Sequence, residues 1–312
     1  MKEELGTTCS SPTNGFTNRE KPPENNGGEG FPANHEFLSN PRQERIEWWK
    51  NAPEKIIKYE AGDVRDANGN IIYTYERGSR LLIGDEKKGE AIEVMDTCET
   101  PWAEATVNRA FEELGRINRP IRVLERGFGM GKTATRVIDH LVIYGGSYTV
   151  IELNKEDANY ARGEWKNDQE QGIEQRNRLR GIPSNGPRIN IEVIEGEAYE
   201  ETAKLAQLAQ KFDIIISDTF PLTENEQGIN DLQDLETLKR CLESNGVFSF
   251  FAYFPGATED MAYRQVDMIT RHFRDYTVSR VNVNPPSDYK YLQTETGPIR
   301  SLPVIICKNP IL

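Results

Sequence analysis

The feature that most constrains the fold is an alternation of short apolar segments with amphipathic ones, which begins near residue 100. Seven apolar runs predict strands at 121–125, 148–153, 189–194, 212–217, 247–253, 277–283 and 302–307. Helical periodicity occupies the intervening segments 101–114, 132–144, 155–180, 199–210, 231–242 and 260–272. Such alternation is typical of parallel strands joined by crossover helices. We therefore predict an α/β fold with a doubly wound, mostly parallel seven-stranded sheet.

The part of the chain before this alternation divides in two. Residues 1–42 are rich in Gly, Pro, Asn, Ser and Glu, a composition that predicts a disordered tail. Residues 43–93 contain a short helix near 44–50 and strand-like runs at 56–59, 71–75 and 80–83, with the turn signal Asp66-Ala67-Asn68-Gly69 between the first two runs. This segment is expected to be an extension with a β-hairpin that acts as a lid over the site, and 94–312 to be the main domain.

Charge and cysteine usage exclude several classes of partner. The formal net charge of −12 disfavours contact with a phosphate backbone, so no nucleic-acid partner is expected. No run of 18 apolar residues and no leader pattern is present, which predicts no membrane association. The 4 cysteines lack paired spacing, which favours a reduced, cytoplasmic protein without a metal site or disulfide framework. A homodimer remains open.

A glycine-rich loop, Glu125-Arg126-Gly127-Phe128-Gly129-Met130-Gly131, follows the strand expected at 121–125. The phosphate-loop pattern G-x-x-x-x-G-K-[ST] matches its end in Gly131-Lys132-Thr133, but only three residues separate the glycines at 127 and 131, one too few. The dinucleotide pattern G-x-G-x-x-G fails because Lys132 stands at its last glycine. The pattern acid-x-G-x-G-x-G of adenosylmethionine-binding loops is satisfied at every position.

Carboxylates stand at the ends of the neighbouring strands. Glu125 is placed to attract the positive charges of adenosylmethionine, and Glu152 is placed for its ribose hydroxyls. Asp218 ends the strand at 212–217 and is expected to face the ligand crevice, although a helix N-cap is the structural alternative. Glu99 precedes Thr100-Pro101, which reads as N-cap and first helical residue, so Glu99 could instead serve only the positive end of that helix.

With these segments the chain resembles the guanidinoacetate methyltransferase family. Residues 94–102 are similar to its V-M-E-x-x-E-T-P-Y, residues 123–130 to V-L-E-V-G-F-G-M, residues 151–154 to I-E-C-N, residues 212–222 to F-D-x-I-x-Y-D-T-Y-P-L, and residues 284–291 to V-P-P-A-D-x-R-Y. The likeness covers about 90 to 308, apart from an extra stretch near 160–187. It implies a Rossmann-like class I methyltransferase fold, S-adenosyl-L-methionine as cofactor, and methyl transfer to a guanidino nitrogen.

The resemblance and the strand-end carboxylates together give a set of site residues. Expected at the cofactor are Trp49, Glu125, Gly127, Phe128, Gly129, Met130, Gly131, Lys132, Thr133, Glu152, Leu153, Asn154, Ala198, Tyr199 and Asp218. Expected at the substrate are Met95, Glu99, Asp218, Tyr253 and Phe254. Two carboxylates can grip a planar guanidinium through paired hydrogen bonds, and one of them can accept a proton from the attacking nitrogen. Asp218 is the expected proton acceptor and Glu99 the second clamp.

Departures from the family pattern bear on the substrate. Pro255 removes a backbone donor that a substrate carboxylate would use, and Ala103 replaces a methionine near the cofactor. Guanidinoacetate, arginine and agmatine therefore all remain candidate small guanidino substrates. Two other classes stay open: a protein arginine N-methyltransferase, and an ATP-binding module that uses Gly131-Lys132-Thr133.

Overall fold

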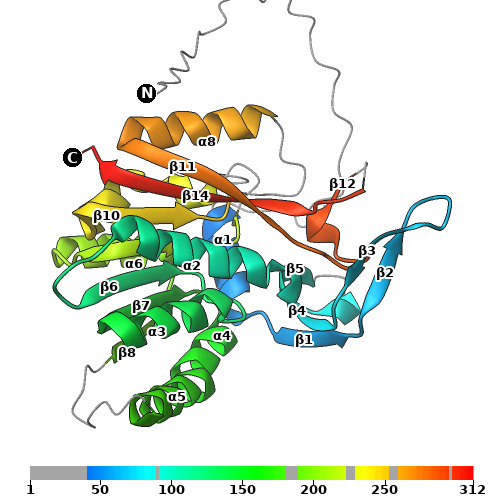
Figure 1. Cartoon of the computed structure of the whole chain (residues 1–312), viewed down its shortest axis with the longest axis horizontal. Helices are drawn as coiled ribbons and strands as arrows, with labels where there is room; N and C mark the ends of the chain where they lie inside the picture. Colours follow the sequence, from blue (N-terminus) through cyan, green and yellow to red (C-terminus); the bar gives the residue numbers. More distant parts are fainter. Residues whose placement is uncertain are drawn as a thin grey trace, which may run out of the picture. The chain divides into compact units, whose positions relative to one another are not determined.

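The central sheet of the computed structural model contains seven strands in the order β11-β14-β10-β9-β6-β7-β8 (Figure 1). Their bounds are β6 Ile121–Arg126, β7 Gly146–Glu152, β8 Ile189–Glu195, β9 Phe212–Ser217, β10 Leu242–Phe250, β11 Phe273–Asn282 and β14 Ser301–Pro310. Strands β10, β9, β6, β7 and β8 pair in parallel, and β14 is antiparallel to both β10 and β11. The structure describes residues 41–88, 91–179, 189–222, 229–252, 259–294 and 297–311, all of which belong to one unit.

Counted from β6, the strands lie in the spatial order 3-2-1-4-5-7-6, with the seventh antiparallel. This is the arrangement of the Rossmann-like class I methyltransferase fold, and the predicted fold class is confirmed. The inner strands are apolar because both of their faces are covered. In β9 every residue is buried, and its one charged member, Asp213, accepts hydrogen bonds from the Arg119 side chain and the Arg122 backbone N–H.

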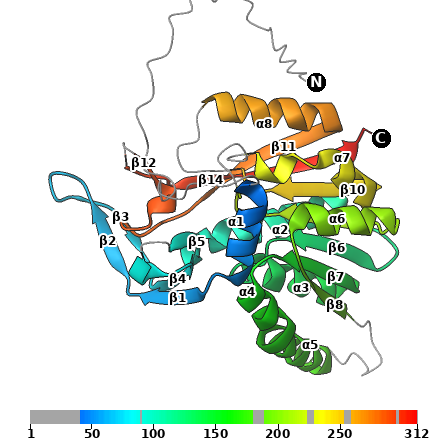
Figure 2. The same ribbon diagram turned by 180° about the vertical axis from the view of Figure 1, so that it is seen from behind.

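Helices cover both faces of the sheet (Figures 1 and 2). Helices α2 (Thr100–Leu114) and α3 (Lys132–Tyr144) pack together on one face. Helices α6 (Ala198–Gln207), α7 (Leu235–Cys241) and α8 (Glu259–His272) lie on the other. The charged stretch expected at 155–180 forms α4 (Lys155–Tyr160), one π-helical turn (Ala161–Trp165) and α5 (Lys166–Leu179).

The segment before the core contains helix α1 (Pro41–Asn51) and two small sheets. Strands β1 (Glu54–Tyr59), β4 (Gly78–Ile83) and β5 (Ile92–Asp96) form one sheet, and β2 (Gly62–Arg65) and β3 (Ile71–Tyr75) form a hairpin. The Asn-Gly turn joins β2 and β3; β2 was not among the strand-like runs seen in the sequence, and β1 pairs with β4. Two apolar runs cannot show from periodicity alone that a third strand lies between them.

Several boundaries differ from those that the sequence predicts. Thr100 is the first residue of α2 rather than its cap, and Glu99, in a 3-10 turn at Thr97–Glu99, occupies the cap position without a side-chain cap hydrogen bond. The helix expected at 231–242 is a 3-10 turn (Asn230–Leu232) followed by α7, and Leu242 already begins β10. Short elements that the sequence does not reveal are Glu86–Lys88, Lys290–Leu292, β12 (Gln293–Thr294) and β13 (Gly297–Pro298).

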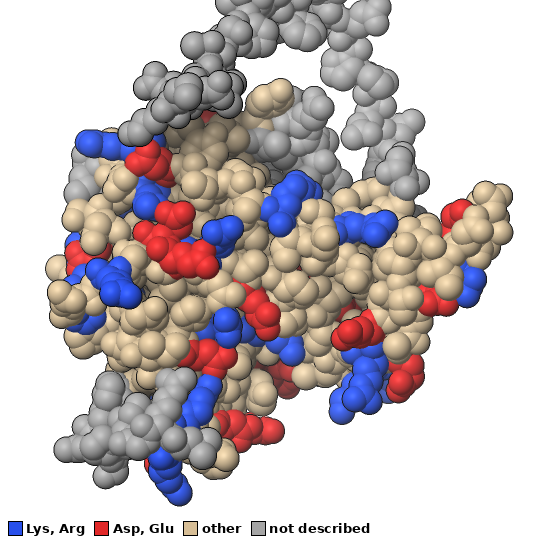
Figure 3. Space-filling model, viewed as in Figure 1, with Lys and Arg blue, Asp and Glu red and all other residues tan. Residues whose placement is uncertain are grey.

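The surface of the described residues carries no large patch of one charge on the face in Figure 3, where lysine and arginine are interspersed with aspartate and glutamate. In the part of the chain that the structure describes, every helix is too short or too polar to span a bilayer. The predicted tail, apart from its last two residues at the start of α1, lies outside the described residues.

Candidate active site

A cavity lies where the strand order reverses between β6 and β9, at the carboxyl ends of these strands, which is the usual ligand position in doubly wound sheets. It encloses about 1010 Å³ of space, part of it open to solvent. Its wall combines the glycine loop after β6, the ends of β7 and β9, the start of α6, and residues of α1, β4 and β5.

The glycine loop turns sharply and passes close to the end of β9. Gly127, Gly129 and Gly131 have φ values of 85°, 48° and 66°, a region that residues with side chains rarely adopt. A Cβ atom on Gly127 would lie 2.2 Å from the backbone oxygen of Asp218. The loop and the Asp218 segment therefore touch through their backbones, which explains why glycine is required there.

Two glutamates at strand ends fix the loop. Glu152 accepts hydrogen bonds from the backbone N–H groups of Phe128 (2.8 Å) and Asn154 (2.7 Å), and burial raises the pKa of its carboxyl. Glu125 accepts a hydrogen bond from the Tyr148 hydroxyl at 2.7 Å, and burial raises its pKa well above the usual range. A cation bound in the cavity would favour the charged forms of both side chains and would in turn be held by them.

Glu99 reaches the cavity from the turn before α2. It is 3% exposed, and its Oε1 accepts a short hydrogen bond from the hydroxyl of Tyr289. Burial raises the pKa of Glu99 well above its usual range, and the negative charge of Asp218 adds to this effect. The alternative that Glu99 only stabilises the positive end of α2 is not supported. Its carboxylate makes no cap hydrogen bond to the helix, accepts a hydrogen bond from Tyr289 and lines the cavity.

Asp218 immediately follows β9 and is partly exposed to the cavity. Its backbone N–H donates to the Arg126 carbonyl at 2.8 Å. Burial, followed by the charge of Asp231, raises the pKa of the Asp218 carboxyl to about 7. A carboxylate with a pKa near neutrality is a much better proton acceptor than an ordinary aspartate, and such shifts are typical of catalytic acids and bases.

Helix α1 covers one side of the cavity. The Trp49 ring stacks on Phe220, with 4.9 Å between ring centroids. The Asn154 side-chain amide donates to the backbone oxygens of Trp49 (3.0 Å) and Ala52 (2.9 Å), so the end of α1 is tied to the start of α4. At its other end, Arg42 pairs with Glu197 at 2.8 Å and lies over the Tyr199 ring.

The cavity is strongly acidic. Its described lining contains the carboxylates of Glu99, Glu125, Glu152, Asp157, Glu197 and Asp218. Against these six, Arg42 is the one lysine or arginine in that lining, and it is paired with Glu197. The described residues contain no group of three or more His, Cys, Asp or Glu side chains that could hold a metal ion. The charge balance therefore favours a cationic ligand over a phosphate.

Most residues that the sequence predicts for the site come together here. The cavity is lined by Trp49, Met95, Glu99, Glu125, Gly127, Phe128, Gly129, Thr133, Glu152, Leu153, Ala198, Tyr199 and Asp218. Met130, Gly131, Lys132 and Asn154 are not part of the lining: the first three continue into α3, and Asn154 is a buried tether and N-cap. Tyr253 and Phe254 lie outside the described residues.

Other residues of the site gave no recognisable signal in the sequence. Asp157 lines the cavity beside Glu152, and burial raises its pKa far above the usual range of an aspartate. Its position two residues inside α4 looked like an ordinary acid in a first helical turn. Phe220, Phe251 and Tyr291 supply aromatic surface. Phe220 and Tyr291 stand in the segments 212–222 and 284–291 that resemble the family, and this was the one available clue among these four residues.

No protein-family model matches the chain, and no curated protein matches it in sequence. Solved structures with a similar fold include spermidine synthase from Thermotoga maritima, with 14% identity over 81% of this chain and 72% of that one and a TM-score of 0.45. Precorrin-6y C5,15-methyltransferase from Geobacter metallireducens shares 15% identity over 66% of this chain and 86% of that one, with a TM-score of 0.39. Both values are low, so the fold class rests on the strand order of this chain.

Proposed function

We propose that the chain is an S-adenosylmethionine-dependent N-methyltransferase whose acceptor is a guanidino nitrogen of a small molecule. The observation that carries the proposal is the convergence of Glu99 and Asp218 on one acidic cavity beside the glycine loop. They come from segments more than a hundred residues apart, and neither carboxylate is consumed by an ion pair with lysine or arginine among the described contacts.

The residues of the cavity fit adenosylmethionine. Its α-ammonium and sulfonium are cations, and Glu125 and Glu152 supply negative charge next to the glycine loop, where the positive φ values let the backbone approach a ligand. ATP fits poorly, since Lys132 does not line the cavity and the one arginine of the lining, Arg42, is already paired with Glu197, which leaves its phosphates no partner of opposite charge there. When bound, the cofactor would supply an electrophilic methyl group on sulfur.

The acceptor chemistry follows from the two carboxylates. A guanidinium is planar and presents its N–H groups in pairs, which suits two carboxylates that approach from different elements. Glu99 orients the group, because its own position is fixed by Tyr289. Asp218 accepts the proton that the attacking nitrogen must lose as the N–C bond forms, and its pKa near 7 suits this role at neutral pH.

The cover provided by α1 favours a small acceptor over a protein chain. Trp49 stacks on Phe220 and Arg42 pairs with Glu197, so these two residues of α1 close one side of the cavity. A protein arginine methyltransferase needs an open groove beside the guanidino site. The two acceptor classes are separated by incubating the enzyme with adenosylmethionine labelled in its methyl group, together with either a panel of free guanidines or a protein extract.

The main test uses the release of S-adenosylhomocysteine. We expect turnover with one or more of guanidinoacetate, arginine and agmatine, and loss of turnover in Asp218→Asn with retained adenosylmethionine binding by calorimetry. Asp213→Asn is the matched control, since it alters another buried aspartate of the β9 segment that lies at the opposite end, away from the cavity. Full activity of Asp218→Asn would refute the mechanism, and tight binding of ATP with Mg²⁺ would refute the cofactor.

A further inference from the structure

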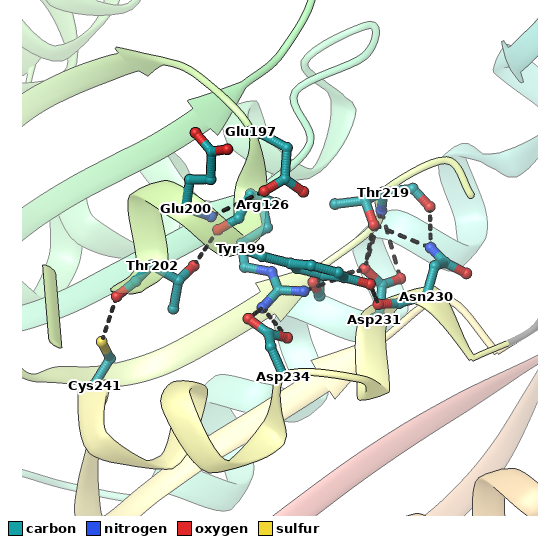
Figure 4. A network of polar contacts seen from close by, with 12 residues as sticks. Arg126, Glu197, Tyr199, Glu200, Thr202, Thr219, Asn230, Asp231, Asp234 and Cys241 are labelled. Atoms are coloured by element: carbon teal, nitrogen blue, oxygen red, sulfur yellow. Dashed lines mark hydrogen bonds and ion pairs between the residues drawn. The ribbon is translucent and has the colours of Figure 1, made fainter. Parts of the chain in front are cut away.

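A buried arginine stands at the end of β6, where the glycine loop begins, and its side chain lies beside Asp234 and Asp231 (Figure 4). Arg126 is fully buried, and its Nη1 donates to both oxygens of Asp234 at 2.8 Å. Its Nη2 lies 3.8 Å from Oδ1 of Asp231, and its guanidinium lies over the ring of Tyr199. Buried ion clusters seldom add net stability compared with well-packed apolar residues, so the stability of the fold alone does not account for this one.

The Asp231 carboxylate holds the residues on both sides of Asp218. The Ser217 hydroxyl donates to Asp231 Oδ1 at 2.8 Å, and the Thr219 hydroxyl donates to the same oxygen at 2.6 Å. The backbone N–H of Thr219 also points to this carboxylate, at 3.3 Å. Residue 218 therefore sits between two anchors on one side chain, while its own N–H is bound to the backbone oxygen of Arg126.

We propose that Asp231, balanced by Arg126, is a positioning residue that clamps Ser217 and Thr219 and thereby holds the Asp218 carboxyl toward the cavity. This inference rests on the proposed function, because the need for a fixed carboxyl comes from the proton transfer. Arg126 and Asp231 are 0% and 2% exposed, so their side chains are too buried to contact a substrate directly. The inference gives this buried cluster an indirect role.

The same arrangement has an electrostatic consequence. The titratable groups near Asp218 are Asp231 from the 3-10 turn before α7, Glu99 from the turn before α2, and Glu125 from β6. Arg126 and Asp234 face Asp231. Burial raises the pKa of Asp231 to about 6 and Arg126 opposes this rise, so Asp231 is ionised at neutral pH and its charge raises the pKa of Asp218.

Two substitutions separate the clamp from the charge. Asp231→Ala removes both, and we expect kcat to fall by about 100-fold with the KM for adenosylmethionine unchanged, because a small displacement of a reacting group is costly. Asp231→Asn keeps an oxygen that can accept from Ser217 and Thr219 but lacks the charge. Its kcat should fall much less, and the acid limb of its kcat/KM profile should move about one unit to lower pH.

Asp213→Asn is again the control, because it removes a buried charge bound to Arg119 without touching residues 217–219. It should lower stability and leave the pH profile where it is. A wild-type kcat in Asp231→Ala would overturn the clamp, and an unmoved acid limb in Asp231→Asn would overturn the effect of its charge, while the proposed function stood in either case.

Failure of the proposed function would look different: the wild-type enzyme would methylate no guanidine at all. The inference then remains testable by carbon-13 NMR titration of the Asp218 carboxyl in folded wild-type protein and in Asp231→Asn. We expect a lower Asp218 pKa in the variant. An identical titration in the two proteins would overturn the effect of the Asp231 charge on Asp218 without any assay of activity.

Discussion

Asn154 provides a test of how the cover over the cavity is held. Its side chain makes four hydrogen bonds: the amide donates to the oxygens of Trp49 and Ala52, and Oδ1 accepts from the backbone N–H groups of Glu156 and Asp157. The residue is fully buried. We therefore compare Asn154→Ala, which removes all four, with Asn154→Asp, which keeps only the two bonds that cap α4.

The expected losses follow from these contacts. Removing the cap costs about 1 kcal/mol. Two buried carbonyl groups that lose their donor cost about 1 kcal/mol each, so Asn154→Ala should lower the free energy of unfolding by about 3 kcal/mol. Asn154→Asp should lose at least about 2 kcal/mol at neutral pH, because aspartate caps a helix as well as asparagine but cannot donate to the oxygens of Trp49 and Ala52 when it is ionised. The burial of its charge beside these two oxygens adds to the loss.

The assay is urea unfolding followed by far-ultraviolet circular dichroism, with tryptophan fluorescence as a second signal to which Trp48 and Trp49 in α1 contribute together with Trp102 and Trp165 of the core. Asn154→Asp should recover part of its stability below pH 5, when a protonated carboxyl regains one donor. Both variants should bind adenosylmethionine more weakly, because the cover is loosened. Equal stability of Asn154→Asp and wild-type protein, together with unchanged fluorescence, would refute the tether.

Three further expectations follow from the site. Tyr289→Phe removes the hydroxyl bound to Glu99, so kcat/KM for the guanidine should fall about tenfold while calorimetry shows unchanged adenosylmethionine affinity; an unaltered kcat/KM would argue against Glu99 as the clamp. Arg126→Met leaves buried carboxylates without their cation and should reduce the free energy of unfolding by about 3–5 kcal/mol, measured by urea titration; a neutral effect would mean that the cluster is solvated. The pKa of Asp218 near 7 has two consequences of opposite sign: kcat/KM should rise with pH through about 7, whereas the ligand-free protein, which binds this proton more tightly than the unfolded chain, should lose stability as pH rises from about 4, the usual pKa of an aspartate, to about 7. Activity that is flat between pH 6 and 8, or a stability profile unchanged in Asp218→Asn, would contradict the assignment.

The elements whose signal is local could be predicted from the sequence. The strand–helix alternation specifies the sheet, and the glycines after β6 have to be glycine because of their backbone angles. Glu125, Glu152 and Asp218 were found because the carboxyl ends of parallel strands meet at one edge, so a residue's place in its own strand already fixes its place in the crevice. Strand β2 was not predicted, because its four residues, Gly62–Arg65, include a single apolar side chain larger than glycine and so carry no strand periodicity.

What only the tertiary structure decided is which buried groups share a contact. Tyr289 and Glu99 are 190 residues apart, and nothing in either local pattern indicates the hydrogen bond between them. Asn154 reads as part of a cofactor segment but binds the backbone of α1, and Arg126 reads as a loop residue but is an ion-pair partner of Asp234. Periodicity records which face of an element is apolar. It does not record the burial of a charge or the identity of its partner, and these two quantities set the pKa values on which the proposed chemistry depends.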